Sequence, residues 1–98
     1  MIRVLTNRTV KSNNLVSAKK QLNELYKAVK INKGFINAKS YIDIEQENIL
    51  TISDWSSKYE WDNWLDSNER HSTLNNYKYT SQITHKVLYK LKDEIFLL

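Results

Sequence analysis

The chain is predicted to form one α+β domain in which helices cover one face of a four-stranded antiparallel sheet. Along its 98 residues, segments with a hydrophobic period of two, typical of strands, alternate with segments of period 3.6, typical of helices. The order is strand, helix, strand, strand, helix, strand. This length supports one hydrophobic core and is too short for a second domain. We therefore assign residues 1–98 to a single domain.

The first third of the chain predicts a strand and a long helix. Residues 2–10, IRVLTNRTV, place side chains alternately on two sides, as a strand does. Residues 15–30 carry apolar side chains at three- and four-residue steps with lysines between them, the pattern of an amphipathic helix. Asn13 or Asn14 can cap its start. Gly34 is expected to end it, because glycine adopts a positive φ without strain.

A hairpin is predicted next. Residues 35–45, FINAKSYIDIE, and 48–55, NILTISDW, have the composition and alternation of strands. The polar pair Gln46-Glu47 between them is expected to form a two-residue turn.

Two short helices and a last strand complete the prediction. Ser56 or Ser57 is a suitable N-cap for the first helix, and Glu60 follows Ser57 at the spacing of a capping box. A second helix is expected over residues 67–76. Residues 82–91, QITHKVLYKL, again alternate as a strand does.

This element order is that of the ferredoxin-like, split βαβ fold. The helices suffice for one face of the sheet only, yet apolar residues occur on both sides of the predicted strands. The second strand shows this, with Ile36, Ala38, Ile42 and Ile44 set against Phe35 and Tyr41. We therefore predict a homodimer that packs sheet against sheet and closes a dimeric α+β barrel.

Composition excludes several classes of function. There is no cysteine, so thiol catalysis and disulfides are ruled out, and the cytoplasm is the expected location. One glycine is too few for a phosphate-binding loop. The net charge of +4 comes mostly from lysines spread along the chain, which does not favour nucleic acid as a partner. No apolar run is long enough to span a membrane.

The tryptophans are concentrated in one short segment. All three lie at positions 55, 61 and 64, where Trp61 and Trp64 share a helix face and Trp55 ends the preceding strand. Aromatic residues at helical spacing usually pack in a core. They can also form a flat apolar wall for a ligand, and the sequence leaves both interpretations open.

The segment ISDWSSKYEWDNWLDSNERH, after a hairpin introduced by KGFINAKSY, resembles the antibiotic biosynthesis monooxygenase (ABM) family of dimeric α+β barrels. In that family a strand ending in Trp is followed by a polar turn, an aromatic residue and Trp-Leu-x-Ser on a helix. The resemblance extends from the first strand to at least Tyr79. It implies the fold and the homodimer predicted above.

The resemblance implies two kinds of chemistry. One branch of these proteins oxidises planar phenols or quinols with dioxygen and without a metal or flavin, while a related branch degrades haem. The haem branch uses an Asn in the first strand, a Trp on the second helix and a later His. Asn7 and Trp64 match the first two, but Leu74 occupies the position of the His. The resemblance therefore implies no cofactor, with haem as the alternative.

The expected substrate is a small aromatic phenol or quinol, with dioxygen, in a pocket between helices and sheet. Trp64 would supply an apolar wall, and Asn7, expected to project towards the helices, would donate a hydrogen bond to the developing oxyanion. His71 could act as the base. Further residues expected to line the cavity are Tyr26, Tyr41 and Leu5.

Other interpretations stay open at this stage. His85 is expected to be packed or to lie at the dimer interface, and His71 to be a solvated helix residue if it is not the base. The whole domain could be a non-catalytic dimeric barrel that binds ligands or acts in a stress response. An open cavity would favour the enzyme, and a cavity filled by side chains would favour the scaffold.

Overall fold

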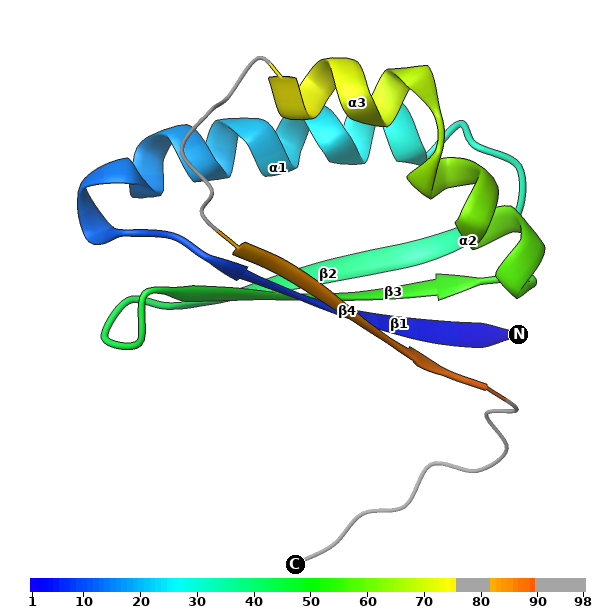
Figure 1. Cartoon of the computed structure of the whole chain (residues 1–98), viewed down its shortest axis with the longest axis horizontal. Coiled ribbons are helices and arrows are strands. Elements are labelled where there is room, and N and C mark those ends of the chain that lie inside the picture. Colours follow the sequence, from blue (N-terminus) through cyan, green and yellow to red (C-terminus); the bar gives the residue numbers. More distant parts are fainter. Residues whose placement is uncertain (76–81, 90–98) are drawn as a thin grey trace, which may run out of the picture.

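The elements follow the predicted order. The computed structural model describes residues 1–75 and 82–89. In this part of the chain the sheet has the strand order β2-β3-β1-β4 and every neighbouring pair is antiparallel. Its strands are β1 (Ile2–Thr9), β2 (Phe35–Asp43), β3 (Asn48–Trp55) and β4 (Gln82–Leu88). The helices α1 (Leu15–Val29), α2 (Lys58–Leu65) and α3 (Asn68–Asn75) all lie on one face of it (Figure 1). The predicted α+β fold class is confirmed.

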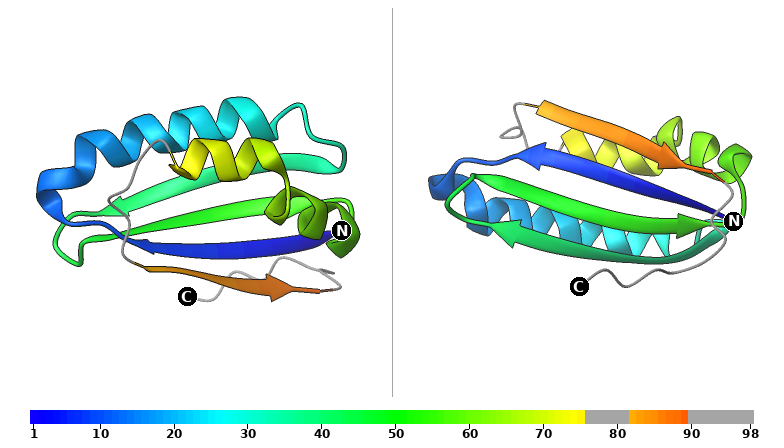
Figure 2. Two further views of the ribbon diagram at one scale, coloured as in Figure 1. Left: turned by 45° about the horizontal axis from the view of Figure 1, so that its top comes forward. Right: turned by 90° about the horizontal axis from the view of Figure 1, so that it is seen from below.

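Strand alternation decides which side chains face the helices. On β1, Val4, Thr6 and Arg8 are buried on the helix side, whereas Leu5 and Asn7 point to the other side. We call that other side the open face, because none of the described helices covers it (Figure 2). No described helix is long and apolar enough to cross a membrane.

The core consists of two separate clusters under the helices. The larger contains Ile2, Val4, Leu25, Val29, Trp55, Trp61 and Trp64. The smaller contains Val10, Ala18 and Ile49, with Leu22 packed against it. Side chains of the larger cluster and Leu22, which packs against the smaller one, line one common cavity. This cavity between the two clusters is the candidate site.

The start of α1 differs from the prediction. A 3₁₀ turn, η1 (Ser12–Asn14), precedes the helix, and Asn14 stands at the N-cap without a side-chain hydrogen bond. Instead, the backbone N–H of Ser12 donates to Glu47 Oε2 at 2.9 Å. The carboxylate from the distant hairpin thus satisfies a donor in the turn that leads into α1, a contact that local sequence cannot reveal.

The hairpin turn is longer than predicted. β2 ends at Asp43 and β3 begins at Asn48, so four residues connect them and the two-residue turn is wrong. Glu47 has φ of 50°, and the backbone N–H of Val10 donates to its carbonyl at 2.8 Å. Asp43 Oδ1 accepts from the N–H of Gln46 at 3.1 Å, which stabilises the wider turn.

A bulge at the start of β2 reverses part of the predicted alternation. Phe35 pairs with Trp55, but the next register partner of β3 is Asn37, so Ile36 is the extra residue. Phe35 and Ala38 consequently both line the cavity on the helix side. The prediction that they lie on opposite sides is wrong, because simple alternation does not hold through a bulge.

The second half follows the prediction closely. Ser57 caps α2, accepting from the N–H of Glu60 at 3.3 Å as the capping box predicts. Ser67 does the same for α3, because its Oγ accepts from the N–H of Arg70 at 3.2 Å. The helix predicted over 67–76 is observed as Asn68–Asn75, and the strand predicted over 82–91 as Gln82–Leu88. Residues 76, 90 and 91 lie outside the described part of the chain.

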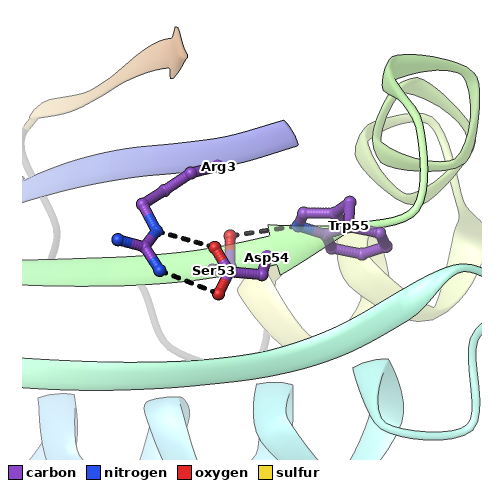
Figure 3. Close-up of polar contacts among 4 residues, drawn as sticks. All are labelled: Arg3, Ser53, Asp54 and Trp55. Carbon is purple, nitrogen blue, oxygen red and sulfur yellow. Dashed lines mark hydrogen bonds and ion pairs between the residues drawn. The ribbon is translucent and has the colours of Figure 1, made fainter. Parts of the chain in front are cut away.

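One ion pair lies on the open face (Figure 3). Arg3 of β1 and Asp54 of β3 are register partners, and the guanidinium donates at 2.7 Å from Nε and 3.1 Å from Nη2 to the two carboxylate oxygens. The Asp54 side chain is only 8% exposed. This bidentate geometry links two neighbouring strands on the face away from the helices.

Gly34 is needed where it stands, although α1 ends before it, at Val29. Its φ is +86°, and a Cβ there would contact the Glu60 side chain and come within 2.8 Å of Ser56 Oγ. Replacing Gly34 by alanine is expected to lower the free energy of unfolding by about 1–2 kcal/mol. Urea denaturation would measure this free energy, and Lys33→Ala, at the neighbouring position, is the control. Equal stability of the two variants would contradict this role.

Candidate functional site

A cavity of about 470 Å³ lies between the helices and the sheet. Its described walls come from all three α-helices and all four strands. Small-molecule sites typically enclose about 300–1,000 Å³, so the volume suits a small ligand. The side chains of residues 1–75 and 82–89 leave this space open, which is the observation expected of a binding or catalytic site.

Aromatic rings form one wall of this cavity. Four edge-to-face contacts connect them in a row, with centroid distances of 6.3, 5.4, 5.4 and 5.2 Å for Tyr26–Phe35, Phe35–Trp55, Trp55–Trp61 and Trp61–His85. Trp64 of α2, 5% exposed, also lines the space. Because each ring packs edge-on against its neighbour, the row presents a continuous apolar surface to an incoming planar group.

A row of polar side chains crosses the floor in register. Ser40, Thr51, Thr6 and His85 are successive partners across β2, β3, β1 and β4, and all line the cavity. Ser40 and Thr51 share a hydrogen bond of 2.8 Å between their hydroxyls, and Thr6 Oγ1 lies 2.9 Å from His85 Nδ1. The row therefore supplies fixed hydrogen-bonding groups beside the aromatic wall.

Positive charge gathers at the same cavity. Arg8, Lys19 and Arg70 line it, and none of its described lining residues is acidic. Arg8 is 7% exposed and donates from Nη1 to Thr51 Oγ1 at 3.2 Å. Burial lowers the pKa of Arg70, and the nearby carboxylate of Asp66 opposes that change. A guanidinium stays charged under these conditions, so an entering ligand meets a positive potential.

His85 is neutral at neutral pH. It is exposed in part, yet the loss of water around it lowers its pKa from 6.5 to about 4, and repulsion by Arg70 and then Arg8 adds to this. Its ring contacts Trp61 edge-on at 5.2 Å. A neutral imidazole beside the cavity can accept a hydrogen bond or a proton from a ligand.

The lowered pKa of His85 predicts a pH-dependent stability. Between about pH 6.5 and 4 the unfolded chain binds a proton at this residue that the folded chain does not. The free energy of unfolding is therefore expected to fall as the pH drops through this window. His85→Asn should reduce that slope. Urea denaturation at several pH values compares this variant with the unaltered protein, and identical slopes for the two would contradict the assignment.

Two of the predicted site residues line the cavity. Trp64 reaches it from α2 and Tyr26 from α1. The helical periodicity of the sequence predicts that both side chains face the sheet. Their chemical roles stay predictions.

Three predicted site residues lie elsewhere. Asn7, Leu5 and Tyr41 are on the open face, where Asn7 Oδ1 accepts from Asn48 Nδ2 at 3.0 Å. The expectation that Asn7 projects towards the helices is wrong, because Thr6 and Arg8 on either side of it are the residues that line the cavity.

His71 does not line the cavity either; it is exposed on α3. The histidine at the cavity is His85, which the sequence suggested only as a packed or interface residue. Its alternation with Ile83 and Val87 was the available signal, but the pattern did not reveal that this side of β4 pairs with Thr6 and faces the helices.

The described residues do not fit haem ligation at the position that the haem branch uses. Leu74 stands there and packs against the larger core cluster, and an aliphatic side chain cannot ligate iron. No three His, Asp or Glu side chains in residues 1–75 and 82–89 converge on a metal position. Hemin titration is expected to give no Soret shift at stoichiometric concentration, and a stoichiometric shift would contradict this.

No model of a known protein family and no curated protein matches the sequence. Solved structures do match. A crystal structure of an antibiotic biosynthesis monooxygenase has a TM-score of 0.80 and 10% identity, over 94% of this chain and 100% of its own. The chain shares the fold of this monooxygenase. The crystal structure of a conserved protein from Methanosarcina mazei Go1 has a TM-score of 0.79 and 16% identity, over 92% of each chain.

A third structure is SnoaB from Streptomyces nogalater, named as a cofactor-independent oxygenase. It has a TM-score of 0.77 at 8% identity and covers 94% of each chain. The ABM resemblance seen in the tryptophan segment is thus confirmed for the fold. At such identities the likeness does not extend to activity, which has to be argued from the cavity.

Proposed function

We propose that this protein is a monooxygenase that oxidises a small aromatic phenol or quinol with dioxygen, without a cofactor. The observation that carries the proposal is the cavity of about 470 Å³ with its wall of aromatic rings and its floor of polar groups. The shared fold with SnoaB, named a cofactor-independent oxygenase, adds support.

Binding would place the substrate ring against Trp61 and Trp64, which exclude water from one side. The cations Arg8 and Arg70 would then favour loss of the phenolic proton, because a phenolate is stabilised by nearby positive charge. His85 lines the cavity and is neutral at neutral pH, so it would accept that proton or its hydrogen bond. The protein would thus raise the fraction of substrate present as the electron-rich anion.

Dioxygen then reacts with that anion, and the substrate itself supplies the electrons. Overall, a substrate SH₂ and O₂ give SO and H₂O. Two C–H or O–H bonds of the substrate are broken, one oxygen atom enters the product and the other leaves as water. The balance requires no external reductant, which is why an aromatic cavity can suffice.

Dioxygen uptake tests the proposal. Protein treated with a chelator would be mixed with a panel of hydroquinones and naphthoquinols under ¹⁸O₂. The expected result is uptake above the uncatalysed rate, with one labelled atom in the product. Absence of enhanced uptake with every member of the panel would overturn the proposal, and so would products that contain no label.

The active form is proposed to be a homodimer that packs open face against open face. Apolar side chains support this, since Leu5, Leu50 and Ile52 lie on that face and Tyr41 is 57% exposed. Such a surface on one protomer complements itself across a two-fold axis.

Sedimentation velocity at micromolar concentration tests the dimer. The unaltered protein is expected to sediment at twice the mass of one chain, and Leu50→Glu to sediment as a monomer. Ile31→Glu, at an 83% exposed position outside this face, is the control and should stay dimeric. A monomeric unaltered protein would contradict the proposal.

A further inference from the structure

We infer that the cavity selects aromatic substrates that carry a negatively charged group such as a carboxylate, held by Arg8, Lys19 and Arg70 while the ring lies against the tryptophans. The inference rests on the proposed function for its choice of site, and it narrows the substrate from phenols and quinols in general to aromatic anions.

Three cationic side chains converge on the cavity. Arg8 comes from β1, Lys19 from α1 and Arg70 from α3, so three separate elements direct positive charge at one space. The described lining includes no carboxylate. A neutral phenol would gain from this charge only once it loses its proton, whereas a ligand that is already an anion would gain charge-assisted hydrogen bonds as it binds, in a site partly shielded from water.

Aromatic and cationic side chains lie at different positions along the sheet. Phe35 and Trp55 of the aromatic wall lie at the start of β2 and the end of β3, and the Arg8 guanidinium reaches Thr51, four positions before Trp55 on β3. At about 3.3 Å per strand residue, Thr51 and Trp55 lie roughly 13 Å apart along β3. That length suits a fused-ring aromatic with a carboxylate at one end. The ring and the anionic group would thus each meet the surface that suits it.

The charges also predict a coupling between binding and protonation. Arg70 and Arg8 both disfavour the protonated form of His85. Lys19 adds a further positive charge from α1. The carboxylate of Asp66, at the C-terminal end of α2, favours the charged form of Arg70. An anion bound among them offsets that repulsion and raises the pKa of His85. Carboxylate binding below about pH 6 is therefore expected to take up protons, which a neutral ligand should not do.

The test uses two probes of nearly the same size and shape, the anion 2-naphthoate and the neutral 2-naphthamide. Neither is a quinol, so binding is measured apart from turnover, by tryptophan fluorescence quenching and calorimetry. The naphthoate is expected to bind roughly tenfold more tightly or better, because a hydrogen bond to a charged group is worth more than one to a neutral group. Its affinity should also fall with added salt.

Neighbouring lysines on α1 give a matched pair of variants. Lys19 lines the cavity and Lys20 does not, although both are exposed and carry the same charge. Lys19→Gln should weaken naphthoate binding severalfold and leave naphthamide unchanged, whereas Lys20→Gln should alter neither. Arg8→Gln is expected to weaken naphthoate binding more strongly than Lys19→Gln. Arg8 is buried, so this variant can fail to fold. In that case the comparison of Lys19→Gln with Lys20→Gln still decides the test.

The outcomes separate the two proposals. Equal affinity for both probes, binding of neither, or equal effects of the two lysine variants would overturn the inference, even if neutral quinols are oxidised. A clear preference for naphthoate in a protein that consumes no dioxygen would leave the anionic site standing and overturn the monooxygenase proposal.

Discussion

Replacing Trp55 by alanine is expected to lower the free energy of unfolding by about 3–5 kcal/mol, the cost typical of removing a buried tryptophan. Trp55 is 1% exposed and sits in the middle of the aromatic row, with Phe35 and Trp61 each 5.4 Å away. Its indole N–H also donates to Ser53 Oγ at 3.0 Å (Figure 3). The substitution removes these contacts together and leaves a void next to the cavity.

Thermal and urea unfolding would measure this loss. For a domain of this size each kcal/mol corresponds to about 4–8 °C in Tm, so a decrease of more than about 12 °C is expected. Tyr59→Ala removes an aromatic ring that is 72% exposed and should change Tm by only a few degrees. A Trp55→Ala protein as stable as the Tyr59→Ala protein would contradict the assigned role.

Trp64→Ala is expected to reduce kcat/KM for quinol oxidation by about a hundredfold. The indole lies at the cavity from α2 and is 5% exposed. Its removal widens the space where the ring should be held, admits water, and lets the substrate leave its reactive orientation, which alone can cost this much in rate. Circular dichroism and an unfolding curve establish that the variant is folded before its rate is compared.

Adjacent residues of β1 supply the control. Asn7 faces the open side and Thr6 the cavity, where Thr6 shares a hydrogen bond with His85. Asn7→Ala is therefore expected to leave turnover unchanged, and Thr6→Val to lower it. If the Asn7 variant were inactive and the Trp64 variant fully active, the site would have to be moved to the other face of the sheet.

The fold was predictable because periodicity alone distinguishes these strands from these helices. The residues at α2 show this well, since Ser57 and Glu60 form the predicted N-terminal cap. The errors arose from contacts between distant segments. Glu47 caps a turn that is remote in sequence, and the bulge at Ile36 depends on how β2 pairs with β3.

The site was harder to predict, since alternation gives two sides of a strand but not which one faces the helices. On β1 the helix side includes Arg8, although arginine is rarely buried. Asn7 was singled out because it matches the Asn of the haem branch, and the alternation of β1 places it on the opposite side. Trp64 was found because helix spacing does indicate the inward face. The gathering of Arg8, Lys19 and Arg70 could not be predicted, since it results from the packing of three elements.

The most direct test of this account is a crystal structure of the protein soaked under anaerobic conditions with a naphthoquinol. Electron density for the ring is expected on the helix face of the sheet, against Trp61 and Trp64 and within reach of Arg8. Density for the ring only on the open face, near Asn7 and Tyr41, would contradict it, as would a cavity closed by the surrounding side chains.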